Sequence, residues 1–137
     1  MVPLLVRQVA SARMHALHTQ DPDMAAWWGT TVECVSAIAR LEREGLLSPA
    51  SSVEAFRRLE GLHPSWYEIE PGEELRDTAK RFLRIHSLSA SDALQLAAAF
   101  VACERRPERL ELLSLDERLC EAARREGFIL AAIPPTR

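Results

Sequence analysis

The sequence predicts an α/β sandwich in which helices pack around a parallel sheet. Short apolar runs alternate along the chain with longer segments whose apolar residues recur at helical spacing. Glycine and proline residues separate the two kinds of segment. Such alternation of strands and helices is typical of a parallel sheet covered by helices. A chain of 137 residues has the typical length of one domain, so we expect a single domain over residues 1–137.

Four segments have the pattern of strands. The first is apolar and aromatic and ends at Gly29. The second alternates apolar and polar residues and is stopped by Pro71 and Gly72. The predicted strands are Met24–Trp28, Trp66–Ile69, Leu110–Leu115 and Phe128–Ile133. Helices outweigh strands in this prediction, and the sheet is one strand short.

Helices are predicted where apolar residues recur at intervals of three and four. Gly45 and Gly127 close two of these segments, as glycine commonly does at a helix C-terminus. The predicted helices are Val32–Glu44, Ser52–Leu62, Glu73–His86, Asp92–Cys103 and Glu117–Glu126, preceded by a helix-like segment at Ser11–Leu17 and a loop at Asp21–Asp23.

The apolar positions also predict which helix faces are buried. The segment Asp92–Cys103 is apolar on nearly every side, so we expect it to be the most buried helix. The predicted buried faces of the two preceding helices are Val53, Phe56 and Leu59 in the first, and Leu75, Ala79, Phe82 and Leu83 in the second.

Composition and charge exclude several classes of protein. The formal net charge is −3, from 17 Lys and Arg against 20 Asp and Glu, and gives no basic field for nucleic acid. No apolar run reaches the ~18 to 20 residues of a membrane-spanning helix, and the apolar start lacks the features of a signal peptide. The three cysteines form no Cys-x-x-Cys pair and are interpreted as small buried hydrophobes. We therefore expect a cytoplasmic protein with no membrane partner.

Three acidic residues each begin a predicted helix: Glu33, Asp92 and Asp116. Glu33 and Asp116 come just after predicted strands, at the edge where α/β proteins bind their ligands. Three carboxylates brought together would repel one another, and a bound Mg²⁺ or Mn²⁺ relieves that repulsion. The spacing therefore suggests an acidic metal site able to activate water.

A purely structural interpretation of the same acids is the more common one. The pairs Thr30–Glu33, Ser89–Asp92 and Ser114–Glu117 all match the capping box, in which the acid satisfies backbone N–H groups. Asp116 is also a candidate N-cap by itself. The pair Ser51–Glu54 has the same spacing, and nothing there suggests chemistry.

Three residues near Glu33 in the sequence are also interpreted as structural. Trp27 and Trp28 could offer a surface for base stacking, but such a pair more often packs into the core on one side and under a helix on the other. Cys34 follows Glu33 without a histidine partner nearby in the sequence, so a nucleophilic role is not expected.

The segments Thr31–Arg40, Ser89–Ala97 and Leu113–Leu119, followed by Gly127, resemble the PIN-domain family, and most closely the VapC-type toxins of bacterial VapBC toxin–antitoxin pairs. The resemblance implies a three-layer α/β/α sandwich and a metal-dependent endoribonuclease with four acids around Mg²⁺ or Mn²⁺. By position, Glu33, Asp92 and Asp116 would be the second, third and fourth acids, and Ser114 would support the site. Such proteins cut structured RNA, often tRNA or rRNA, are blocked by a cognate antitoxin, and usually form homodimers.

The chain departs from the family pattern at its start. Family members begin with a strand that ends in Asp followed by Thr or Ser, and this first strand and first acid are absent. The residues Val2–Val6 resemble the segment that normally follows, so we expect a PIN-like domain truncated at its N-terminus that binds metal weakly and cleaves poorly. The alternative is a catalytically inactive PIN-like module that acts by binding a protein such as the antitoxin. A small-molecule-binding α/β domain is a weaker option, because the five glycines form no phosphate-binding loop.

Overall fold

The computed structural model describes residues 23–132 of the chain. The predicted helix-like segment Ser11–Leu17, the first two residues of the predicted loop and Ile133 lie outside the described residues. The chain divides into two compact units, which within the described part comprise residues 23–68 and Ile69–Ala132. None of the helices between residues 23 and 132 is long and apolar enough to cross a membrane.

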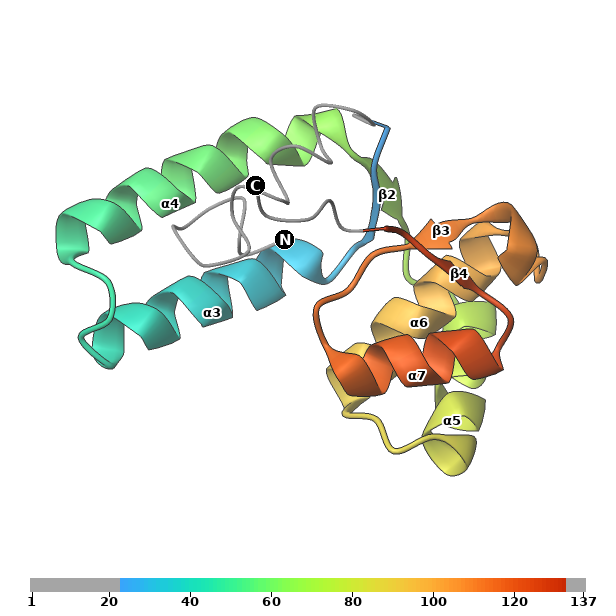
Figure 1. Cartoon of the computed structure of the whole chain (residues 1–137). Coiled ribbons are helices and arrows are strands. Elements are labelled where there is room, and N and C mark those ends of the chain that lie inside the picture. The colour runs from blue at the N-terminus through green and yellow to red at the C-terminus, as the bar shows by residue number, and fades with distance from the viewer. Residues whose placement is uncertain (1–22, 133–137) are drawn as a thin grey trace. The chain divides into compact units, whose positions relative to one another are not determined.

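The described part of the first unit contains two α-helices and two short strands, and its helices α3 and α4 are labelled in Figure 1. The strands β1 and β2 pair with each other, and the Tyr67 N–H donates to the Met24 carbonyl across 2.8 Å. Figure 1 shows α3 and α4 running side by side and joined by a turn, in which Gly45 has a φ of 72°. The elements in chain order are β1 (Ala25–Trp27), α3 (Thr30–Arg43), α4 (Pro49–Leu62), the 3-10 turn His63–Ser65 and β2 (Tyr67–Ile69).

The core of the first unit lies between α3, α4 and the strands. Cys34 and Ile38 of α3 pack in one cluster with Ala55 and Leu59 of α4, and the cluster also contains Ala26 and Trp66. The predicted face of α4 is wrong at Val53, which is 59% exposed. Ser52 is buried instead, because its hydroxyl donates to the Ser48 carbonyl across 3.2 Å and needs no water.

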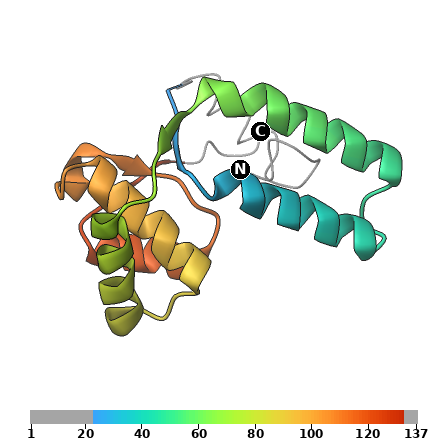
Figure 2. The same cartoon turned by 180° about the vertical axis from the view of Figure 1, so that it is seen from behind.

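The second unit contains three helices and a second pair of strands, seen from behind in Figure 2. The strands β3 and β4 run parallel, with Glu111 opposite Ile129 and Leu112 opposite Leu130. The helix α7 connects them, so β3, α7 and β4 form one crossover unit. The elements in chain order are α5 (Glu73–Ile85), α6 (Ala90–Ala102), the 3-10 turn Pro107–Arg109, β3 (Glu111–Leu112), α7 (Glu117–Arg125) and β4 (Ile129–Leu130).

The helix α6 forms the centre of the second unit and contacts both α5 and α7. No residue from 91 to 101 is exposed, which confirms the expectation that this is the most buried helix of the described chain. Phe82 of α5 is fully buried and meets Phe100 edge to face, with ring centroids 5.6 Å apart. The predicted face of α5 is wrong at Leu83, which is 42% exposed because Leu75, Thr78 and Phe82 set the buried stripe.

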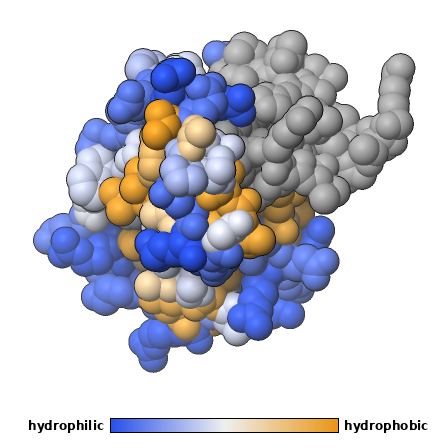
Figure 3. Space-filling model, turned by 90° about the vertical axis from the view of Figure 1, so that its left-hand side faces the viewer, coloured by the Kyte–Doolittle hydropathy of each residue, from blue (hydrophilic) through white to orange (hydrophobic). Residues whose placement is uncertain are grey.

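Exposed apolar side chains occur on both units. Figure 3 shows one face of the molecule, on which apolar patches lie among hydrophilic residues. Scattered apolar side chains are ordinary on protein surfaces and carry no functional conclusion here. They include Trp28, Val32, Val35, Leu46, Val53 and Tyr67 in the first unit, and Leu83, Ile85, Leu113, Leu115 and Ile129 in the second.

The described residues therefore form a mixed α/β protein with short strands, two of which are shown to be parallel. The order of helices and strands agrees with the sequence prediction, although the strands are shorter than predicted. A three-layer sandwich built on one central sheet stays a prediction, as does the single domain over residues 1–137.

Candidate metal-binding residues

Glu33 lies in the first turn of α3, six residues after Trp27 of β1. The helix begins after Gly29, so Thr30 is already its first residue and the predicted Thr30–Glu33 capping box does not form. The carboxylate is instead held by the preceding strand, since Nε1 of Trp27 donates to Oε1 of Glu33 across 2.9 Å. Glu33 is partly buried.

Asp92 lies in the first turn of α6, and Ser89 is the N-cap of that helix. The Ser89 hydroxyl accepts from the Asp92 backbone N–H at 3.1 Å and donates to Oδ2 of Asp92 at 2.9 Å. The serine half of the predicted capping box is thus confirmed, while the carboxylate binds the serine hydroxyl. Asp92 is partly buried, and the bond restricts its orientation.

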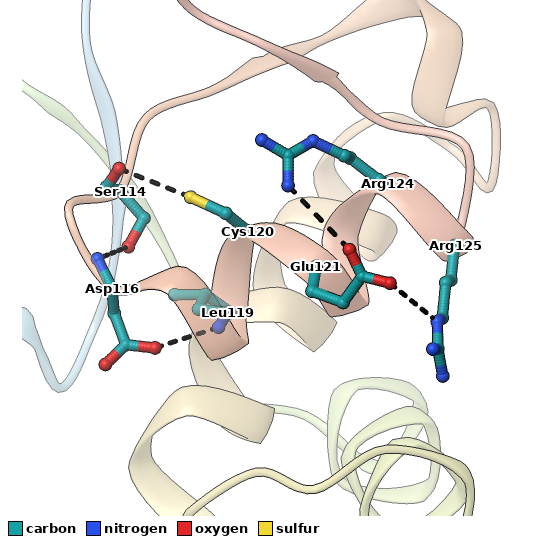
Figure 4. Close-up of polar contacts among 7 residues, drawn as sticks. All are labelled: Ser114, Asp116, Leu119, Cys120, Glu121, Arg124 and Arg125. Atoms are coloured by element: carbon teal, nitrogen blue, oxygen red, sulfur yellow. Dashed lines mark hydrogen bonds and ion pairs between the residues drawn. The ribbon is translucent and has the colours of Figure 1, made fainter.

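Asp116 follows β3 and is itself the N-cap of α7, as one of the two capping interpretations predicted (Figure 4). Its Oδ1 accepts from the Leu119 N–H across 2.9 Å. Ser114 turns the chain toward the helix, since its hydroxyl accepts from the Asp116 N–H at 3.0 Å. The competing Ser114–Glu117 capping box is therefore wrong, because the cap is Asp116. The Asp116 side chain is exposed to solvent.

The pair Ser51–Glu54, which has the same spacing, gives a useful comparison. The N-cap of α4 is Ser48, whose hydroxyl accepts from the Ser51 N–H at 3.1 Å. Glu54 forms ion pairs with Arg57 and Arg58 on the exposed side of the helix. The four-residue pattern alone therefore does not locate a cap.

The structure brings two of the three predicted ligands into one unit. Asp92 lies in the first turn of α6 and Asp116 caps α7, and the two helices contact each other. Figures 1 and 2 show both helices beginning on the same side of the second unit. Glu33, by contrast, belongs to the first unit. Among residues 23–132, no three His, Cys, Asp or Glu side chains form a group that could hold a metal ion.

The sequence pattern did not predict Trp27 as the hydrogen-bond partner of Glu33. The sequence does contain one indication of this bond. A partly buried indole N–H usually has a hydrogen-bond acceptor, and the Glu33 carboxylate lies only six residues after Trp27. The interpretation of Cys34 as a buried hydrophobe is confirmed, and the same holds for Cys103. Burial raises the pKa of the Cys34 thiol, and the charge of Glu33 adds to the rise. Such a thiol is a poor nucleophile at neutral pH.

Comparison with protein-family models gives no match for this chain, and comparison with curated proteins gives none either.

Proposed function

We propose that this chain is a metal-dependent endoribonuclease of the PIN-domain type, acting in the cytoplasm as the toxin component of a toxin–antitoxin pair. The observation that carries the proposal is the position of Asp116. This acid lies between the parallel strand β3 and the helix that it caps, at the edge where α/β proteins bind ligands. The resemblance of the motifs around Glu33, Asp92 and Asp116 to those of PIN domains supplies the reaction.

The carboxylate oxygens of the three acids are of the kind that Mg²⁺ and Mn²⁺ prefer. Each of the three carboxylates is oriented by a local hydrogen bond, from Trp27 to Glu33, from Ser89 to Asp92, and from the Leu119 N–H to Asp116. Metal-ligating carboxylates are typically held by such outer partners.

The remaining groups at these positions would serve the RNA. A divalent ion held by the acids would lower the pKa of water and neutralise the charge that develops on the phosphodiester. The N-terminal ends of α6 and α7 carry partial positive charge, which favours a phosphate there. Ser114 fixes the backbone of Asp116 and so keeps this carboxylate at the helix start. The substrate would be a structured RNA of the tRNA or rRNA class, and a cognate antitoxin and a second copy of the chain would be partners.

A second candidate function follows from the capping bonds. Ser89 caps α6 and donates to the Asp92 carboxylate, and Asp116 caps α7, so Asp92 and Asp116 each have a structural role that requires no metal. This favours a catalytically inactive PIN-like module that acts by binding an antitoxin.

Cleavage of a folded tRNA in Mg²⁺ or Mn²⁺ separates the two functions. For the nuclease, wild-type protein cuts the RNA, EDTA stops the cut, and Asp92→Asn loses activity. Asp77→Asn is the matched control, because Asp77 is 73% exposed and pairs only with Lys80 one turn along α5 among the contacts of the described chain. Cleavage that Asp92→Asn leaves unchanged contradicts the site, and a wild-type chain that neither cuts RNA nor binds metal supports the module.

A further inference from the structure

The indole of Trp27 connects the end of β1 to the first turn of α3. Its Nε1–H donates to Oε1 of Glu33 across 2.9 Å in a partly buried environment. A hydrogen bond to an ionised carboxylate is shorter and stronger than one between neutral groups. The bond therefore fixes one oxygen of Glu33 relative to the strand.

The ring of Trp27 lies directly on the backbone of Gly29. A Cβ atom at position 29 would lie 2.6 Å from Cε2 of Trp27 and still closer to Cζ2. The φ of Gly29 is −76°, which any residue can adopt, so the glycine is required by the ring and not by the backbone. At Gly61 and Gly72, by contrast, an added Cβ would meet open space in the described structure.

Both contacts involve the Trp27 side chain. Gly29 admits the Trp27 ring, and the ring then presents its N–H to Glu33. We propose that Trp27 is a positioning residue for Glu33, which sets the orientation in which this acid meets a divalent ion. The inference rests on the proposed function, since it concerns Glu33 as a metal ligand. Trp27 contacts the acid and acts through it.

A positioning role and a purely structural role predict different measurements. Loss of an outer partner that orients a ligating side chain typically lowers metal affinity by about 10- to 100-fold. A bond that only secures the start of α3 would lower the urea midpoint of unfolding and leave the affinity for an ion unchanged. Metal affinity, measured separately from stability and from RNA cleavage, therefore distinguishes the two roles.

The first test is the Trp27→Phe variant, which keeps an aromatic ring and removes the N–H. Binding of Mn²⁺ is followed by the electron paramagnetic resonance signal of the free ion, and folding by circular dichroism and urea unfolding. We expect the Kd for Mn²⁺ to rise about 10-fold. The matched control is Trp28→Phe at a half-exposed tryptophan whose ring meets that of Trp27 edge to face at 6.3 Å. Phenylalanine keeps an aromatic ring at that contact, so we expect a change of less than about twofold.

The second test displaces the ring and leaves the indole intact. In Gly29→Ala the added methyl group forces Trp27 out of its place, so the N–H no longer reaches Glu33. We expect a loss of Mn²⁺ affinity similar to that of Trp27→Phe. Gly61→Ala is the control, because its Cβ would meet open space on α4. This second variant keeps the proposal testable if Trp27→Phe does not fold.

The outcomes separate the inference from the proposed function. If Glu33→Gln weakens Mn²⁺ binding while folded Trp27→Phe and Gly29→Ala bind like wild type, the positioning role is wrong and the metal site stands. If wild-type protein binds no Mn²⁺, or Glu33→Gln binds it like wild type, the role of Glu33 as a ligand fails and the inference fails with it.

Discussion

The Nε2 atom of His86 lies 2.6 Å from Oε1 of Glu126, and the two side chains are only 5% and 15% exposed. His86 is the C-cap of α5 and Glu126 is the C-cap of α7, 40 residues further along the chain. The imidazole also meets the ring of Phe82 edge to face at 5.9 Å. The pair therefore links the C-terminal ends of α5 and α7. Both helices contact α6, whose first turn contains Asp92.

Replacement of Glu126 by alanine should destabilise the second unit, because it leaves a buried imidazole without its partner. We expect Glu126→Ala to lower the free energy of unfolding by about 1.5 to 3 kcal/mol. The control is Glu121→Ala on the same helix, whose ion pairs with Arg124 and Arg125 are exposed and worth about 0 to 1 kcal/mol. Urea unfolding measures the loss of free energy in both variants. Equal losses would show that the buried His86–Glu126 pair stabilises the fold no more than the exposed pairs of Glu121.

Phe82 and Leu83 are adjacent, and the structure predicts very different costs for truncating them. Phe82 is fully buried, so Phe82→Ala should cost about 3 to 5 kcal/mol of unfolding free energy. Leu83 is 42% exposed, so Leu83→Ala should cost less than about 1 kcal/mol. Urea denaturation of the two variants checks the orientation of α5, and a larger loss for Leu83→Ala would contradict it.

Phe82 and Leu83 also show how far the sequence could predict the fold. The spacing of apolar residues located every helix of the described chain, and Gly45 and Gly127 marked two helix ends at which φ is positive. Two buried faces were predicted only in part, because small hydroxyl residues occupy core positions. Ser52 and Thr78 are buried by donating to carbonyls of their own helices, at 3.2 and 2.7 Å. A hydropathy pattern does not anticipate this.

The sequence predicted where the three candidate acids lie along the helices, but it did not predict all of their hydrogen-bond partners. The sequence indicated that Glu33, Asp92 and Asp116 begin helices, and the structure places each in the first turn or at the N-cap. Spacing indicated Ser89 and Asp116 as caps, but it also indicated a Thr30–Glu33 box that does not form, because Gly29 is the N-cap of α3 and its missing side chain leaves room for the Trp27 ring. Such choices depend on packing between strand and helix.

Cys34 and Cys103 are buried, whereas Cys120 is only partly buried. Burial raises the pKa of Cys34 and of Cys103, so folding favours the protonated thiols. Their contribution to stability is complete below the pKa of an unfolded thiol, about 8.5, and is lost as the pH rises further. We expect iodoacetamide to modify both residues slowly in native protein at pH 7.5 and rapidly in urea. Equal native and unfolded rates for Cys34, measured by mass spectrometry, would contradict its burial.

Two substitutions at Asp116 separate its capping role from its charge. Asparagine caps helices about as well as aspartate, so Asp116→Asn should change the free energy of unfolding by less than about 0.5 kcal/mol. Asp116→Ala removes the acceptor for the Leu119 N–H and should cost about 0.5 to 2 kcal/mol. Thermal and urea unfolding measure both variants. A large loss of stability in Asp116→Asn would mean that the charge itself holds the fold, and would weaken the case for a metal ligand.

The double variant Asp92→Asn/Asp116→Asn tests most directly whether these acids bind a divalent ion. It removes two charges and keeps oxygen acceptors for the bonds from Ser89 and Leu119, so its urea midpoint should stay close to that of wild type. Titration with Mn²⁺, followed by the paramagnetic resonance of the free ion, should show binding to wild type and a Kd at least ~10-fold higher for the variant. Equal Mn²⁺ affinity of the two proteins, or no binding by wild type, would contradict the metal site.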